Sequence, residues 1–305
     1  MIEVKDVTKR YGDTLAVDHL SFTVKPGIVT GFLGPNGAGK TTTMRMILGL
    51  DSPSSGTVTV NGRAYRDIAA PMHQIGALLD AKAANGGHTA RQHLGWIARA
   101  GGIPSRRVAE VLEIVGLAEV AERRVGGFSL GMYQRLGIAA ALLGDPQTLI
   151  FDEPVNGLDP EGIRWIRSLL QGLASEGRTI LLSSHLMSEM EATADHVIVI
   201  GRGQLIADTS IAAFTQRSAS SHVRVVSPQS GDLVPLLQRA GATVNAEDGA
   251  LIVTGIEAPA IGNVAAVHGL ELHELSPRRA SLEAAFMELT HGSQQYQGAL
   301  SSSAA

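Results

Sequence analysis

The sequence has no cysteine among its 305 residues, and aromatic side chains make up only 4% of it. Without cysteine the chain forms no disulfide, zinc ribbon or iron–sulfur cluster, which fits a reducing compartment. Because Phe, Trp and Tyr are scarce, we expect a core built from Val, Ile, Leu and Ala.

Long apolar runs are also missing. A helix that crosses a bilayer needs about 20 apolar residues, and the longest run here, 138–143, is far shorter. The first residues, 1–6, lack the basic and then apolar pattern of a signal peptide. We therefore expect a cytoplasmic chain that reaches a membrane only through a partner or a surface contact.

There is no excess of positive charge. The chain has 25 Lys and Arg residues against 29 Asp and Glu residues, which gives a formal net charge of −4. Proteins whose main partner is nucleic acid usually carry a basic patch or a basic balance. The charge therefore argues against a nucleic-acid partner.

The pattern of residue types changes along the chain. Residues 1–213 alternate short apolar runs, helical runs and glycine-rich turns, a pattern typical of an α/β domain. Residues 214–221 are polar and serine-rich, so we interpret them as a linker. We expect a small α+β domain over 222–291 and a disordered tail over 292–305, where Gln, Ser and Ala dominate.

Short apolar runs predict the strands of a parallel sheet in the first domain. They cover 28–33, 148–151, 179–182 and 197–200. Glycines at 201–203 predict a hairpin that closes this domain. The segment 41–50 predicts a helix with Thr42 and Met46 on one side.

The order of predicted elements changes after the linker. Strands are predicted over 222–227, 242–246, 250–254 and 270–275, and helices over 231–240 and 258–267. This β-α-β-β-α-β order is that of a ferredoxin-like fold. A last helix is predicted over 281–290, with Leu282, Ala285, Phe286 and Leu289 on one face.

A segment of the form G-x-x-x-x-G-K-[ST] lies between the first predicted strand and helix. It consists of Gly34, Pro35, Asn36, Gly37, Ala38, Gly39, Lys40 and Thr41, and Thr42 follows as a further candidate nucleotide-binding residue. Glycines let backbone N–H groups curl around phosphates, and the helix start presents its positive end to the anion. We expect Lys40 to reach the β- and γ-phosphates and the Thr41 hydroxyl to ligate Mg²⁺. The segment therefore predicts a phosphate-binding loop for a nucleoside triphosphate.

A glycine-rich turn that binds nothing is the alternative. Average residue usage predicts a chance match in roughly one chain in a hundred of this length. A chance match that also lies between a strand and a helix is rarer still, so we prefer the phosphate-binding loop.

Two acidic residues, Asp152 and Glu153, directly follow the predicted strand 148–151. Ligands bind at the carboxyl ends of strands in α/β sheets. We expect Asp152 to hold Mg²⁺, directly or through water, and Glu153 to polarise the attacking water. The alternative is a solvated acidic turn, which the phosphate-binding loop upstream makes less favoured.

Further motifs follow in a definite order. They are Asp152-Glu153-Pro154, Gly157-Leu158-Asp159-Pro160 and Ser183-Ser184-His185, preceded by Phe-Ser-Leu-Gly-Met-Tyr-Gln-Arg-Leu at 128–136. Together with the phosphate-binding loop, they resemble the ATP-binding subunit of an ABC transporter across residues 1 to about 205. The resemblance implies a P-loop ABC-type nucleotide-binding domain with a helical signature subdomain, and ATP hydrolysis coupled to transport.

The resemblance also implies roles for individual residues. Tyr11 falls where the family stacks an aromatic ring on adenine. Ser129 and Gly131 fall where the family contacts the γ-phosphate bound to the other subunit of a head-to-tail dimer. His185 would lie near the γ-phosphate as a second catalytic residue, and Asp159 would bridge the two subunits.

The sequence departs from the family pattern at three places. Where the family has a glutamine that senses magnesium and contacts the membrane partner, this chain has Asp80. A carboxylate can still ligate Mg²⁺, so Asp80 is a further candidate metal ligand. The usual L-S-G-G-Q reads Phe-Ser-Leu-Gly-Met at 128–132, which keeps the serine and the second glycine, and Gly127 precedes it.

The variant signature and the added C-terminal region resemble the subgroup that works with ABC-2-type permeases, especially antibiotic self-resistance exporters. This implies a protein on the inner face of the cell membrane, paired with a second copy or a related subunit and with an integral-membrane permease. It favours export of a drug, antibiotic, peptide or lipid-like substrate. For the C-terminal domain it suggests regulation or dimerisation.

Two other functions are considered. One is a soluble ABC-type ATPase that acts on ribosomes or DNA, which usually has two such domains, a coiled-coil insertion or basic arms, none of them visible here. The other is a module that binds ATP without hydrolysing it. Glu153 and His185 argue against that second function.

Overall fold

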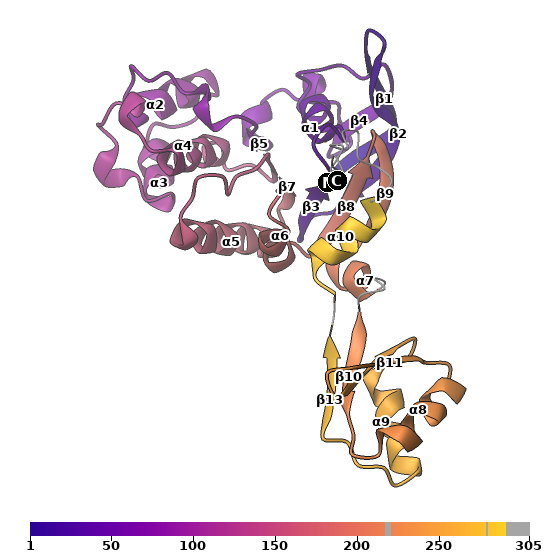
Figure 1. Ribbon diagram of the computed structural model, residues 1–305. Coiled ribbons are helices and arrows are strands. Elements are labelled where there is room, and N and C mark those ends of the chain that lie inside the picture. The colour runs from indigo at the N-terminus through magenta and orange to yellow at the C-terminus, as the bar shows by residue number, and fades with distance from the viewer. Residues whose placement is uncertain (217–220, 279, 291–305) are drawn as a thin grey trace, which may run out of the picture. The chain divides into compact units, whose positions relative to one another are not determined.

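The computed structural model describes residues 1–216, 221–278 and 280–290. It forms two compact units, which comprise Met1–Ser210 and Ile211–Leu289 (Figure 1). Each unit has its own buried apolar core, so each is described by itself.

A six-stranded sheet forms the centre of the first unit, with strand order β5-β6-β7-β3-β8-β9. Its strands are β3 (Val29–Leu33), β5 (Ile75–Leu78), β6 (Thr148–Phe151), β7 (Thr179–Ser183), β8 (His196–Gly201) and β9 (Gln204–Ser210). All neighbours pair in parallel except β8 and β9. Every residue of β3, β6 and β7 is buried, which explains their continuous apolar sequences. The predicted strands and the closing hairpin are confirmed.

A second, antiparallel sheet has the order β2-β1-β4. Its strands are β1 (Ile2–Tyr11), β2 (Thr14–Val24) and β4 (Ser55–Val60). Helix α1 (Lys40–Ile47) ends three residues before the predicted end at Leu50. That prediction was wrong because Gly49, with a left-handed φ of 64°, turns the chain away.

Helices α2 (Ala90–Ala100), α3 (Arg106–Ile114) and α4 (Leu130–Leu142) lie together on one side of the first unit (Figure 1). They form the predicted helical signature subdomain. Helix α5 (Pro160–Ser175) follows β6, and α6 (Met187–Thr193) follows β7. Short 3-10 turns cover Tyr65–Asp67, Pro71–His73, Ala81–Ala83, Ala118–Val120 and Val125–Gly127.

Side-chain caps determine where several helices begin. At the start of α2, Gln92 N donates to Thr89 Oγ1 at 3.1 Å and Thr89 N donates to Gln92 Oε1 at 3.0 Å. Ser129 caps α4 and Asp159 caps α5. Pro160 occupies the first turn of α5, where its fixed φ and missing N–H suit a helix start.

The second unit contains an antiparallel sheet with the order β11-β12-β10-β13. Its strands are β10 (His222–Val226), β11 (Thr243–Glu247), β12 (Ala250–Thr254) and β13 (Glu274–Arg278), and this part of the chain has the helices α7 (Ile211–Gln216), α8 (Ser230–Arg239), α9 (Ala258–Val267) and α10 (Leu282–Thr290). The first and third strands along the chain lie in the middle of the sheet. Together with the β-α-β-β-α-β order, this confirms the predicted ferredoxin-like fold.

Two boundary predictions were wrong. The expected linker 214–221 begins inside α7, where Phe214 is buried. The last strand of the second unit is β13, and not 270–275. The rest of the expected linker at 217–220 and the expected tail at 292–305 lie outside the described residues.

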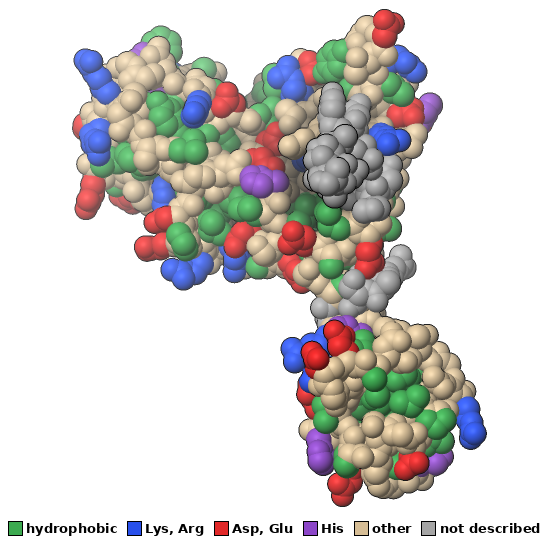
Figure 2. All heavy atoms as spheres, viewed as in Figure 1, with side chains coloured by type: hydrophobic (Ala, Val, Ile, Leu, Met, Phe, Trp, Pro, Cys, Tyr) green, Lys and Arg blue, Asp and Glu red, His purple; other side chains and the backbone are tan. Residues whose placement is uncertain are grey.

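Within the described residues, no helix combines the length and apolar character that a membrane crossing requires. On the face shown in Figure 2, Lys and Arg side chains lie interspersed with Asp and Glu. The absence of a nucleic-acid partner stays a prediction.

Candidate functional site

The carboxyl ends of β3, β7 and β6 lie next to each other, because these strands are neighbours in a parallel sheet. The phosphate-binding loop follows β3, and Asp152 and Glu153 follow β6. Ser183 ends β7, two residues before His185. The topology therefore gathers motifs that are far apart in the sequence at one edge of the sheet.

Glycines give the phosphate-binding loop its shape. The loop runs from Gly34 through Pro35, Asn36, Gly37, Ala38 and Gly39 to Lys40 and Thr41 at the start of α1. Gly37 and Gly39 have left-handed φ values of 81° and 102°. A Cβ atom at Gly39 would lie 2.6 Å from the carbonyl oxygen of Ala16, and one at Gly34 would lie 2.5 Å from that of Ile200. Neither position accepts a larger residue unless the backbone moves.

Lys40 lies folded against this loop. Its Nζ donates to the carbonyl oxygens of Gly34 at 2.5 Å and Pro35 at 3.2 Å. Burial lowers the pKa of Lys40, while the negative charges of Glu153 and Asp152 act in the opposite direction. An anionic phosphate beside Nζ would stabilise the charged form of this lysine.

Asp152 is held through both carboxylate oxygens. Thr41 Oγ1 donates to Asp152 Oδ2 at 2.7 Å, and Ser183 Oγ donates to Asp152 Oδ1 at 2.5 Å. Hydroxyl and carboxylate oxygens are ligands that Mg²⁺ prefers, so Thr41 and Asp152 fit this ion. No group of three or more His, Cys, Asp or Glu suited to a metal occurs in the described part of the chain. Such a sparse set suits an ion that also takes water and phosphate ligands.

The two predicted catalytic residues are in direct contact. Glu153 Oε2 accepts a hydrogen bond from His185 N at 3.2 Å and lies 2.7 Å from His185 Nδ1. A proton on Nδ1 makes the second contact a hydrogen bond as well. The Glu153 side chain is 26% exposed, so water can reach its carboxylate.

Two residues that hold Glu153 were missed by the prediction from sequence. Ser183 Oγ accepts a hydrogen bond from Glu153 N at 2.9 Å. Gln134 Nε2 donates to the carbonyl oxygen of Glu153 at 2.7 Å. The available signals were a hydroxyl at the end of a buried strand and a glutamine within the mostly apolar α4.

Tyr11 ends β1 and is 47% exposed. Its hydroxyl donates to Asp51 Oδ2 at 2.8 Å, and Lys9 Nζ lies 4.7 Å from its ring centroid. The pKa of Tyr11 is raised, first by burial and then by the bond to Asp51. Thr42 and Arg45 act on this pKa in the opposite direction. Stacking of this ring on adenine stays a prediction.

The residues expected at a subunit interface lie at helix starts. Ser129 is exposed, and its Oγ accepts a backbone N–H of α4 at 3.3 Å. A Cβ atom at Gly131 would lie 2.8 Å from the carbonyl oxygen of Gly157. Asp159 Oδ1 accepts from Gly162 N at 2.9 Å and caps α5. The cap is a finding, whereas the roles between subunits stay predictions.

Asp80 follows β5 at the same edge of the sheet. Its Oδ1 accepts a hydrogen bond from Lys82 N at 2.8 Å and so caps the turn Ala81–Ala83. Over the described ranges, Asp80 forms no hydrogen bond with Thr41 or Asp152, which bond directly to each other. Magnesium binding by Asp80 stays a prediction.

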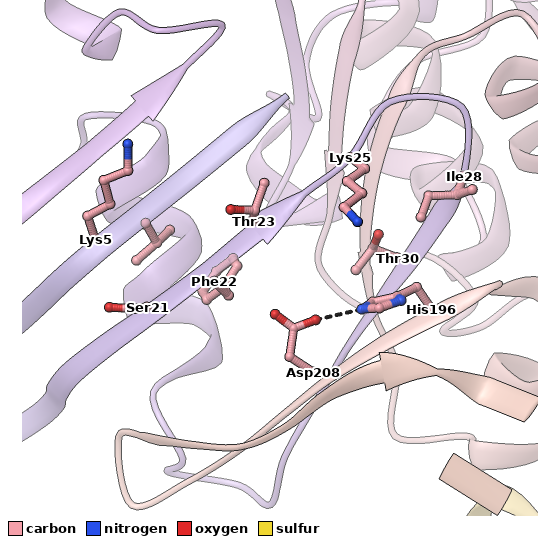
Figure 3. Close-up of a pocket in the computed structure, with 10 residues that line it drawn as sticks. Lys5, Ser21, Phe22, Thr23, Lys25, Ile28, Thr30, His196 and Asp208 are labelled. Atoms are coloured by element: carbon pink, nitrogen blue, oxygen red, sulfur yellow. Dashed lines mark hydrogen bonds and ion pairs between the residues drawn. The ribbon is translucent and has the colours of Figure 1, made fainter. Parts of the chain in front are cut away.

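A separate cavity of about 480 Å³ lies near the amino end of β3 (Figure 3). The phosphate-binding loop follows the carboxyl end of the same strand. Lys25 and Thr30 line it, together with a pair formed by His196 Nε2 and Asp208 Oδ1 at 2.6 Å. None of its lining residues belongs to the phosphate-binding loop, and neither Asp152 nor Glu153 lines it. This cavity is therefore not part of the candidate site.

Comparison with known proteins agrees with this geometry. The profile of the ABC transporter family matches residues 17–156, and a domain of unknown function matches residues 221–283. The chain is 47% identical over 209 residues to the bacitracin transport ATP-binding protein BcrA of Bacillus licheniformis, covering 68% of each chain. It is 36% identical over 293 residues to the uncharacterized ABC transporter ATP-binding protein YhcH of Bacillus subtilis, covering 95% of this chain and 96% of YhcH.

A solved structure gives the same result for the fold. The dimeric structure of a bacterial ABC transporter cassette superposes with a TM-score of 0.64 at 25% identity. The match covers 69% of this chain and 99% of that cassette.

Proposed function

This chain belongs to the ABC transporter family, and on that premise we propose that it drives export of a peptide antibiotic or a related drug through an ABC-2-type permease. It is an ATP-binding and ATP-hydrolysing subunit that powers transport. It acts as a dimer with a membrane permease. Docking on that permease would place it at the inner face of the membrane.

One observation carries the proposed chemistry: a single edge of the sheet holds Lys40, Thr41, Asp152, Glu153 and His185. Lys40 and the backbone N–H groups of the phosphate-binding loop would bind the β- and γ-phosphates. Glu153 would polarise the attacking water. His185 would orient the Glu153 carboxylate through the contact of 2.7 Å.

Magnesium would bind where the Thr41 hydroxyl meets the Asp152 carboxylate, at 2.7 Å. When bound, the ion would offset negative charge on the phosphates. Ser183 supports this role because it occupies the other oxygen of Asp152 and so fixes the direction of the carboxylate.

We place the two subunits of the dimer head to tail, so that Ser129 and Gly131 of one copy approach the nucleotide on the other. The exposure of Ser129 at the start of α4 supports this arrangement. The positive end of a helix favours an anion there. Tyr11, which is 47% exposed, would stack on adenine.

The cargo proposal rests on similarity to a protein named for bacitracin transport. The second unit contributes none of the residues in the proposed chemistry and has its own core. We therefore assign it to regulation or to stabilisation of the dimer.

The proposal is tested by measuring the resistance of cells to bacitracin. The chain is expressed with its permease in a bacitracin-sensitive bacterium, and the inhibitory concentration of bacitracin is measured. The parent should raise this concentration, and Glu153→Gln should not. Glu122→Gln is the matched control, because the exposed pair of Glu122 with Arg91 is worth little.

Equal protection by Glu153→Gln and the parent would contradict the proposal. So would a chain that never co-purifies with the permease from detergent-solubilised membranes. The second result would favour a soluble ABC-type ATPase.

A further inference from the structure

Glu153 has a backbone conformation that its neighbours must maintain. Its φ of 53° lies in the left-handed region, which is uncommon for a residue other than glycine. Pro154 follows it and further restricts the backbone of Glu153. Such conformations persist only where surrounding contacts determine them, and they cluster at functional sites.

Two side chains form hydrogen bonds with the main chain of Glu153. Ser183 Oγ accepts from its N–H at 2.9 Å, and Gln134 Nε2 donates to its carbonyl oxygen at 2.7 Å. Gln134 is only 4% exposed, so water does not readily replace its bond.

Gln134 belongs to α4, the helix that Ser129 caps. At 1.5 Å per residue, Gln134 lies roughly 7.5 Å along the axis from Ser129. Its bond crosses from the helical subdomain to the end of β6. Helix α4, which begins within the signature motif, therefore binds Glu153 of the same chain.

We propose that Gln134 is a positioning residue, which holds Glu153 in its left-handed conformation and thereby aims the carboxylate at the water to be activated. This rests on the proposed role of Glu153 in hydrolysis. Loss of the bond frees the Glu153 peptide to leave the conformation in which His185 holds its carboxylate. The nucleotide contacts of Lys40 and Thr41 do not depend on it.

Gln134→Leu removes the donor and keeps most of the side-chain volume. We expect kcat for ATP to fall about tenfold, since one hydrogen bond in a buried place is lost. The KM should change less than about twofold, because loss of positioning lowers kcat without removing binding. Gln134→Met provides a second variant in case leucine disturbs the packing.

Arg135→Met is the matched structural control. Arg135 is the next residue of α4, but its Nη1 donates to the carbonyl oxygen of Val115 at 2.8 Å and its guanidinium lies 4.4 Å from the Trp165 ring. The Arg135 variant should lose thermal stability and keep the parent kcat per folded molecule.

Two further measurements test whether Gln134 acts through Glu153. In the nucleotide-free protein, amide hydrogen exchange over residues 152–157 should be faster in Gln134→Leu than in the parent and in Arg135→Met. In a Glu153→Gln background, adding Gln134→Leu should leave the residual ATPase rate unchanged.

The proposal is overturned if Gln134→Leu keeps the parent kcat, if only its KM changes, or if it slows the Glu153→Gln protein further. A parent rate in Glu153→Gln alone would overturn the proposed function of Glu153, and this proposal with it. Those results are distinct, because in the first set the rate of Glu153→Gln alone stays far below that of the parent.

Discussion

Lys40 is a partly buried cation, and burial lowers its pKa below the ordinary value of 10.5. The unfolded chain therefore holds this proton to higher pH than the folded chain, and stability rises with pH where the unfolded state binds more protons. The free energy of unfolding of the nucleotide-free parent should rise, relative to Lys40→Met, between the lowered pKa and 10.5. Urea unfolding of both proteins over this window measures the difference, and a difference that is constant with pH would contradict the expectation.

Asp159 has a structural role that substitution separates from a role between subunits. Its Oδ1 accepts from Gly162 N at 2.9 Å and caps α5. Alanine at such a cap costs about 1 kcal/mol, whereas asparagine caps as well as aspartate. Asp159→Ala should therefore lower the free energy of unfolding by about 1 kcal/mol and Asp159→Asn should not, as measured by urea titration.

Equal stability of the two Asp159 variants would show that the cap is unimportant. The ATPase rate of Asp159→Asn then tests the other role, because bridging by charge between subunits requires the carboxylate. A parent rate in this variant would exclude bridging by charge.

At the residue scale, the sequence predicted which side chains lie together, but not the side chains that bind the main chain of Glu153. The motifs in the sequence indicated the pair of Glu153 and His185, and the structure brings these side chains together at 2.7 Å. Ser183 and Gln134 bind main-chain atoms of Glu153 instead. Such bonds depend on which strand and helix lie beside β6, and no spacing rule within one motif reveals them.

At the scale of elements, the start of α2 depends on its reciprocal cap. Thr89→Ala removes the acceptor for Gln92 N, which should cost about 1 kcal/mol. For a unit of this size the Tm should fall by about 2–4 °C. Calorimetry checks this against Arg99→Ala, a change at an exposed position of the same helix that should leave Tm nearly unchanged. Equal melting of the Thr89 variant and the parent would contradict the role of the cap.

Strands were predictable from the sequence where all of their side chains are buried. Strands β3, β6 and β7 are buried throughout and therefore read as apolar runs. The last strand was misplaced because Leu270 and Leu272 suggested a strand, although they only pack against the core of the second unit. Pairing with β10, from Val226 with Glu274 to His222 with Arg278, sets the true strand.

At the scale of the whole molecule, the proposed chemistry belongs to one of the two units. All residues of the proposed chemistry and a separate apolar core lie within Met1–Ser210. A chain that ends at Ser210 should therefore fold and bind ATP within about twofold of the parent affinity, since domains with their own core can fold alone. Circular dichroism and equilibrium ATP binding check this, and an unfolded fragment would contradict it.

The central claim is that this chain hydrolyses ATP with Glu153 as the group that polarises water. The most direct measurement is steady-state ATP turnover of purified Glu153→Gln beside the parent, with ATP affinity determined for both and Glu122→Gln as control. Because general-base catalysis contributes about 10²–10⁴-fold, turnover by Glu153→Gln should fall at least about 100-fold while ATP affinity is kept. Turnover at the parent rate by a Glu153→Gln protein that binds ATP normally would contradict the claim.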